Sequence, residues 1–143
     1  MDEILAVLRS LPGVLELAPV AGSEHPEISW GDHFFYYAPD GEVPTNRQPY
    51  ATFVTKDYPD DASSQLSAPG RWRLNIHVGP ELLASLVSSA DPSEPDAFFP
   101  HPLYGDYGWV AVVNPGPVTM PRALDALREA HAADQRRVER RHS

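Results

Sequence analysis

The stretch "GRWRLNIHVG", residues 70–79, has the pattern of a β-strand with two unlike faces. Side chains along a strand point alternately to the two faces of its sheet. The even positions are apolar: Trp72, Leu74, Ile76 and Val78. The odd positions are polar: Arg71, Arg73, Asn75 and His77. We therefore expect the even face to pack against helices, and we treat the odd face as the candidate functional surface.

Other segments of the chain show the same strand character. Aromatic and β-branched residues are dense at residues 33–37, 50–57 and 109–114, and a short strand is also expected near residues 14–17. Successive strands joined by short turns favour antiparallel pairing. The sequence therefore predicts an antiparallel sheet of four to five strands.

Three helices are expected around these strands. Apolar residues recur at helical spacing after Asp2 and Glu3, and the pattern stops at residues 12–13, which are Pro-Gly. A middle helix is expected to begin at Pro80, and a C-terminal helix to follow Thr119 as its N-cap. The predicted fold class is α+β, one domain over residues 1–143, with the helices packed mainly on one face of the sheet.

Composition excludes several classes of function. The chain has no cysteine, which rules out disulfides and thiolate catalysis, and its net charge of −9 argues against nucleic acid and anionic membranes as partners. The acidic start at Asp2 and Glu3 differs from a signal peptide, and no run approaches the ~18 apolar residues needed to cross a bilayer. We expect a cytoplasmic protein without a membrane partner; its oligomeric state is left open.

The charge is unevenly distributed. Residues 136–143 form a basic tail that contains Arg136, Arg137, Arg140 and Arg141. Without its four bases and one acid, the chain keeps seven bases and nineteen acids, a net charge of −12. The tail is interpreted either as a solvated helix end, where arginine suits the helix dipole, or as a docking segment.

The odd face of residues 71–77 also has two interpretations. Its side chains could be solvated, or they could form the floor of a groove in which arginine holds a carboxylate or phosphate. Loops at residues 57–69 and 101–108 would then cover the groove, with Tyr104 and Tyr107 at its rim. The predicted ligand-binding residues are Arg71, Arg73, Asn75, His77, Asp32, Asp57, Tyr58, Tyr104 and Tyr107.

The acidic residues of this set allow other roles. Asp32, in "WGDHF", fits a turn that needs a hydrogen-bonding side chain. Asp57, in "KDYPDD", belongs to an acidic cluster without the ligand spacing of a calcium loop, so this cluster is interpreted either as a solvated loop or as partners for Arg71 and Arg73. No metal is predicted, since no histidine lies in a ligand-spaced pair, and no nucleotide cofactor is predicted, since no nucleotide-binding glycine loop is present.

The histidines supply the remaining chemistry. His33 and His77 could approach each other across the sheet, which is a weak indication of a metal site, although histidine more often bonds the backbone. His77 could instead act as a general base oriented by Asp32 or Asp57, with Arg71 or Arg73 stabilising an anion. No nucleophile has a catalytic context. The favoured function is non-catalytic binding of a small or peptidic anionic ligand, with an enzyme or a nucleic-acid or protein docking module as alternatives.

Four segments carry a resemblance to known families: "SWGDHFFYY", "YATFVTKDYP", "GRWRLNIHVG" and "HPLYGDYGWVAVVNPG". They resemble signature segments of a bacterial domain-of-unknown-function family, which implies no activity. More distantly, "LNIHVGPELLASL" and "YGWVAVVNPGPV" are similar to the MmcQ/YjbR-like family, whose double-wing fold is likened to DNA-binding domains. This chain departs from that family in having a single lysine and an acidic charge, so the resemblance implies the fold rather than DNA binding.

Overall fold

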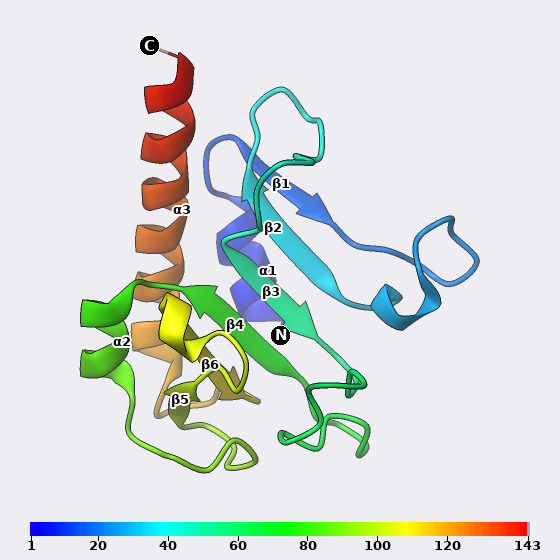
Figure 1. Cartoon of the computed structure of the whole chain (residues 1–143), viewed down its shortest axis with the longest axis vertical. Helices are drawn as coiled ribbons and strands as arrows, with labels where there is room; N and C mark the ends of the chain where they lie inside the picture. The colour runs from blue at the N-terminus through cyan, green and yellow to red at the C-terminus, as the bar shows by residue number, and fades with distance from the viewer. Residues whose placement is uncertain (143) are drawn as a thin grey trace.

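The computed structural model describes residues 1–142, apart from the side chain of His142, and these residues form three α-helices and a six-stranded sheet (Figure 1). Ser143, at the end of the predicted basic tail, lies outside the described residues. The helices are α1 (Asp2–Arg9), α2 (Pro80–Leu86) and α3 (Met120–His142). The strands are β1 (Val14–Leu17), β2 (His33–Tyr37), β3 (Ala51–Val54), β4 (Arg73–His77), β5 (Phe98–Pro100) and β6 (Trp109–Val113).

The sheet is antiparallel throughout, with the strand order β1-β2-β3-β4-β6-β5. This confirms the α+β prediction, but the described residues contain one strand more than the four to five expected. The additional strand, β5, lies in a proline-rich segment and pairs Phe98 with Val112. A strand of three residues that ends in proline is too short for its alternation to be recognised in the sequence.

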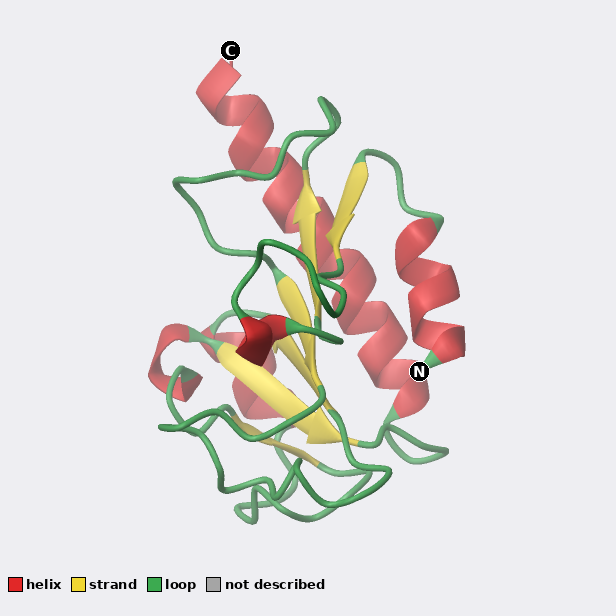
Figure 2. Cartoon of the chain, turned by 90° about the vertical axis from the view of Figure 1, so that its right-hand side faces the viewer, coloured by secondary structure: helices red, strands yellow, loops and turns green. Residues whose placement is uncertain are grey.

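The even face of β4 packs against the helices, as predicted. Leu74 and Ile76 are fully buried in a cluster that includes Ile4 and Leu8 from α1 and Leu127 from α3. Burying each such side chain stabilises the fold by about 1.5–3 kcal/mol. Figure 2 shows the sheet nearly edge-on, with α1 and much of α3 along one side and long loops along the other.

The odd face of β4 is covered in part by the loop of residues 57–69. Leu66 from this loop packs with Phe99 and Val113 in a second, smaller buried cluster. As a result Arg73 and Asn75 are only 1% and 3% exposed, so this part of the face is not simply solvated.

The third helix, α3, begins beside a partly buried carboxylate, that of Asp96. Asp96 accepts the backbone N–H groups of Gly116, Val118 and Thr119, and the hydroxyl of Thr119 donates to the same carboxylate. A carboxylate there suits the positive end of the helix dipole. In the described part of the chain, neither α3 nor another helix combines the length and apolar character needed to span a bilayer. The cytoplasmic location stays a prediction.

Candidate functional site

The loop side of the sheet contains a hollow of about 740 Å³, which we term the sheet hollow. Its walls come from β2, β3, β4 and β6 and from the loops that follow β3 and β5. Six aromatic side chains line it: Phe34, Tyr36, Tyr58, Tyr104, Tyr107 and Trp109. Phe34 and Tyr36 lie one strand position apart from the buried Phe35, so the continuous aromatic run of β2 supplies both the core and this hollow.

Arg73 organises the polar floor of the sheet hollow. Its Nη1 lies 3.0 Å from one carboxylate oxygen of Asp61, and its Nη2 donates to the other. Its Nη1 also donates to Ser64 Oγ at 3.0 Å, and its Nε donates to Asn75 Oδ1 at 2.9 Å. The guanidinium of Arg73 is therefore committed to the protein itself, and it ties the loop of residues 57–69 to the sheet.

Asp61 and His101 complete the buried cluster around Arg73. Burial alone would raise the pKa of Asp61, but the hydrogen bonds and charge of Arg73 hold it below the usual range. Burial and the neighbouring charge of Arg73 lower the pKa of His101 to about 4. At neutral pH the cluster therefore contains a charged carboxylate and a neutral imidazole.

The neutral ring of His101 also shapes the rim of the hollow. Its Nδ1 accepts the backbone N–H groups of Leu103 and Tyr104, each at 3.1 Å. The ring centroids of His101 and Tyr104 lie 4.8 Å apart. His101 thus holds the turn that presents Tyr104 to the hollow.

The structure brings together five of the nine predicted ligand-binding residues. Arg73, Asn75, Tyr58, Tyr104 and Tyr107 all line the sheet hollow. The expected pairing of the acidic cluster with an arginine is present as the Asp61–Arg73 ion pair.

Three other predicted residues, Arg71, Asp57 and Asp32, are absent from the lining of the sheet hollow. Arg71 donates to the backbone carbonyls of Ser64 and Ser93. Asp57 accepts the backbone N–H of Leu66 at 2.8 Å. Arg71 and Asp57 therefore stabilise loops and do not line the sheet hollow.

Asp32 does not have the turn role that its sequence context favoured, because its side chain bonds residues 23 to 26 positions later rather than the backbone of its own turn. Its buried carboxylate accepts the backbone N–H and hydroxyl of Thr55, the ammonium of Lys56 and the hydroxyl of Tyr58. Burial first, and then the hydrogen bond to Asp32, raises the pKa of Tyr58. Asp32 therefore holds Tyr58 in place. Tyr58 lines the sheet hollow, whereas Asp32 does not.

Two hypotheses about His77 are wrong: a metal site shared with His33, and a general base oriented by Asp32 or Asp57. His33 packs on Phe53, whose neighbour in register is Leu74, so it lies on the helix side of the sheet, opposite to His77. His77 Nε2 lies 3.1 Å from the carbonyl oxygen of Tyr107, and neither Asp32 nor Asp57 orients its ring. Across the described residues, no three histidine or carboxylate side chains gather as a metal site would require.

Some site residues were not found from the sequence. His101 and Trp109 belong to the hollow because β6 pairs with β4 and β5 in a register that no local pattern reveals. A usable signal was present on the last helix, where Asp134, Arg137, Val138 and Arg141 recur at helical spacing. These four side chains, together with His77, line a second hollow beside the first.

The whole chain, residues 1–143, matches a family described as "Family of unknown function (DUF6194)". This confirms the resemblance to a family of unknown function. No curated protein and no solved structure matches the chain. The resemblance to the MmcQ/YjbR-like fold accordingly stays a prediction.

Proposed function

We propose that this chain, which belongs to the Family of unknown function (DUF6194), is a non-catalytic binding protein for a small or peptidic ligand. The ligand has a flat apolar body, which lies in the sheet hollow, and an anionic end. The aromatic lining of the hollow carries the proposal, since ligand pockets are mostly apolar, hold few polar groups and measure about 300–1,000 Å³.

The exposed tyrosines support a ligand with a flat body. Tyr104 and Tyr107 are 49% and 74% exposed, although rings of this size usually bury their apolar surface. Both line the hollow together with Phe34 and Trp109. A planar group placed between them would cover apolar surface that water now contacts.

The polar residues on the floor of the sheet hollow support binding of a ligand rather than catalysis of a reaction on it. Asn75 donates to Thr52 Oγ1 at 3.0 Å and accepts from Arg73, so its amide orientation is fixed. Because Asp61 binds both terminal nitrogens of Arg73, the anionic end of a ligand is better placed towards His77.

The proposal is tested with two probes, neutral p-cresol and its carboxylate analogue 4-hydroxyphenylacetate. Titration followed by NMR should give saturable shifts at the amides of Phe34, Asn75 and Trp109. The double variant Tyr104→Ser/Tyr107→Ser should weaken binding about tenfold, since each aromatic contact contributes about 0.5–1.5 kcal/mol.

Val118→Ser is the matched control, because Val118 is 76% exposed and lies outside the lining of the sheet hollow. It should bind both probes as the wild type does. The proposal fails if neither probe shifts the three amides at millimolar concentration, or if the double variant binds as tightly as the wild type.

A further inference from the structure

A second hollow, of about 290 Å³, adjoins the sheet hollow at the end of β4, and we term it the helix-end hollow. Gln48, Pro49, Tyr107 and Trp109 line both hollows, so the two are continuous. Figure 2 shows α3 running diagonally, so that its C-terminal end leans towards the loop side of the sheet. That end of the helix forms the new wall.

The helix-end hollow is positively charged in an acidic molecule. Arg47, Arg137 and Arg141 line it together with a single carboxylate, Asp134, whereas the whole chain has a net charge of −9. The three residues from α3 are three and four positions apart, which places them on one face of the helix. That face lines the hollow and stays accessible to water at Arg141, which is exposed.

Asp134 fixes two of the arginines and leaves the third without an ion pair. Its Oδ2 accepts the backbone N–H of Tyr37 at 2.8 Å and lies 2.6 Å from Arg47 Nη1. Its Oδ1 accepts from Arg137 Nη2 at 3.4 Å. Among the described residues Arg141 has no ion-pair partner, so this hollow keeps positive charge after the internal pairing is counted.

We propose that the helix-end hollow binds the phosphate monoester group of the ligand whose flat body lies in the sheet hollow. The placement of the body rests on the proposed function, whereas the phosphate site rests on its own residues. A phosphate monoester presents three terminal oxygens, which can accept from the forks of Arg137 and Arg141 at once. A carboxylate presents only two oxygens, and a single arginine fork can engage both of them, so it offers fewer acceptor positions to a second fork.

The same geometry favours a small molecule over a polymer. A hollow of about 290 Å³ accommodates a phosphate group and a few further atoms. The acidic surface of a chain with a net charge of −9 repels the repeated phosphates of a nucleic acid. One phosphate at the end of a ring-bearing molecule matches both hollows.

The test compares phenyl phosphate, inorganic phosphate and p-cresol by NMR titration and calorimetry at fixed ionic strength. Arg141→Gln should weaken binding of phenyl phosphate about tenfold, the loss expected for one charge-assisted hydrogen-bond donor, and leave p-cresol binding unchanged. Arg137→Gln should have the same effect, and Asp134 keeps its contacts with Arg47 and Tyr37 in that variant.

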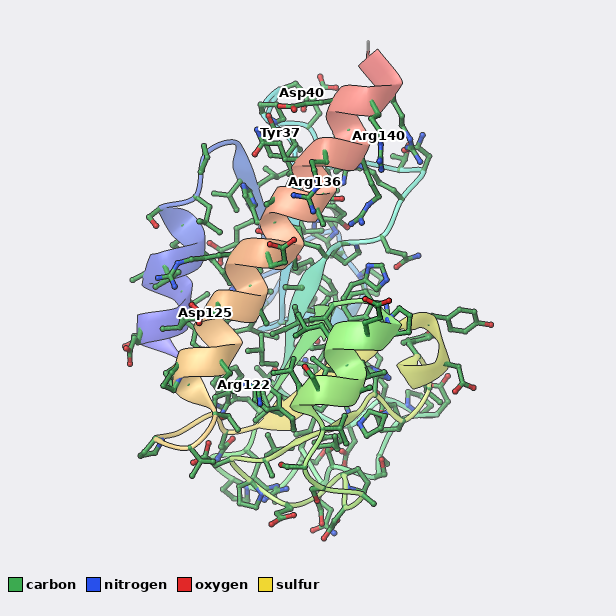
Figure 3. All side chains as sticks on the ribbon, turned by 90° about the vertical axis from the view of Figure 1, so that its left-hand side faces the viewer. Tyr37, Asp40, Arg122, Asp125, Arg136 and Arg140 are labelled. Carbon is green, nitrogen blue, oxygen red and sulfur yellow. The ribbon has the colours of Figure 1, made fainter. Side chains whose placement is uncertain are left out.

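Arg136→Gln is the matched control. Arg136 lies on the same helix and pairs with Glu129, but it does not line the helix-end hollow (Figure 3). The Arg136→Gln substitution removes the same charge as the two test variants, but it should change the affinity for phenyl phosphate by less than about twofold. Circular dichroism of each variant establishes that it is folded.

The possible results separate the two proposals. If phenyl phosphate binds no tighter than p-cresol, or if both arginine variants retain wild-type affinity, the phosphate site is wrong, and the proposed function stands provided that p-cresol still gives saturable shifts. If both phosphates bind and lose affinity in Arg141→Gln while p-cresol shifts nothing, the phosphate site stands and the proposed function fails. Tighter binding of a single-stranded oligonucleotide than of phenyl phosphate would overturn the small-molecule assignment.

Discussion

At the scale of single residues, the Asp61–Arg73–His101 cluster gives the protein a specific response to acid. Burial and Arg73 lower the pKa of His101 from its ordinary 6.5 to about 4. Between these two pH values His101 is protonated in the unfolded chain but stays neutral in the folded chain. Stability therefore falls as the pH is lowered from 6.5 to 4, by about 3 kcal/mol from this residue, and the effect is complete below pH 4.

The measurement is the free energy of unfolding in denaturant at pH 7 and pH 4.5. His101→Gln keeps an oxygen that can accept the N–H groups of Leu103 and Tyr104 but cannot titrate, so its loss of stability at pH 4.5 should be smaller by about 2–3 kcal/mol. His25→Gln, outside the cluster, should behave as the wild type. Equal pH dependence in His101→Gln and wild type would contradict the assignment. Asp61, whose pKa is lowered from 3.8, adds its own loss only in more acidic solution.

A variant of Arg73 would not report on ligand binding, because this side chain is already bound within the protein. Its position on the odd face of β4 follows from alternation, but its fork is bound by Asp61 from a loop twelve residues earlier. Removing Arg73 would leave a buried carboxylate unpaired, which destabilises a protein by about 3–5 kcal/mol. Loss of binding in such a variant would reflect loss of the loop rather than loss of a ligand contact.

At the scale of elements, two glycines hold the end of β4 against the start of β6. The carbonyl oxygen of Gly108 accepts the backbone N–H groups of Val78 and Gly79. A Cβ on Gly108 would lie 2.7 Å from the Cα of Gly79, and the φ of Gly108 is +87°. Both the close approach and the left-handed backbone require glycine here.

Gly108→Ala is therefore expected to destabilise the protein by more than about 2 kcal/mol, because it combines backbone strain with a steric clash. Gly41→Ala is the control, since Gly41 has a φ of +77° but no atom near its added Cβ. It should cost about 1 kcal/mol from the backbone alone. Thermal unfolding compares the two variants, and equal losses would show that the contact between the glycines is not close.

At the scale of the whole molecule, α3 has a structural part and a charged part. Among the side chains of α3 that the structure describes, the buried ones, including Leu127, His131 and Asp134, all precede the basic tail. His131 Nδ1 lies 2.8 Å from the hydroxyl of Tyr50, and Nε2 lies 2.7 Å from the carbonyl oxygen of Pro12, so this part of α3 is joined to the turn after α1 and to the residue before β3. The tail beyond it contributes charge to the helix-end hollow.

A chain that ends at Gln135 should therefore keep cooperative unfolding, with a stability within about 1–2 kcal/mol of the full chain, since Asp134 retains Arg47 and the N–H of Tyr37. The same truncation should weaken binding of phenyl phosphate to about the level of p-cresol, because it removes Arg137 and Arg141 but leaves the sheet hollow intact. Calorimetry measures both quantities. Non-cooperative unfolding of the shortened chain would mean that the tail belongs to the folded core.

Local patterns in the sequence determined the elements other than β5, and the faces of β4. Alternation at residues 70–79 identified the side of β4 that packs on helices, and the aromatic run at residues 33–37 marked β2, because side-chain period and burial are properties of neighbouring residues. Only the tertiary structure decided the partners: Asp61 for Arg73, opposite sheet faces for His33 and His77, and α3 beside the end of β4. These pairings depend on strand register and loop packing between residues distant in the chain, which alternation cannot encode. A strand pattern specifies which side chains share a face, while the elements that cross that face decide whether it is hollow and which charges remain unpaired.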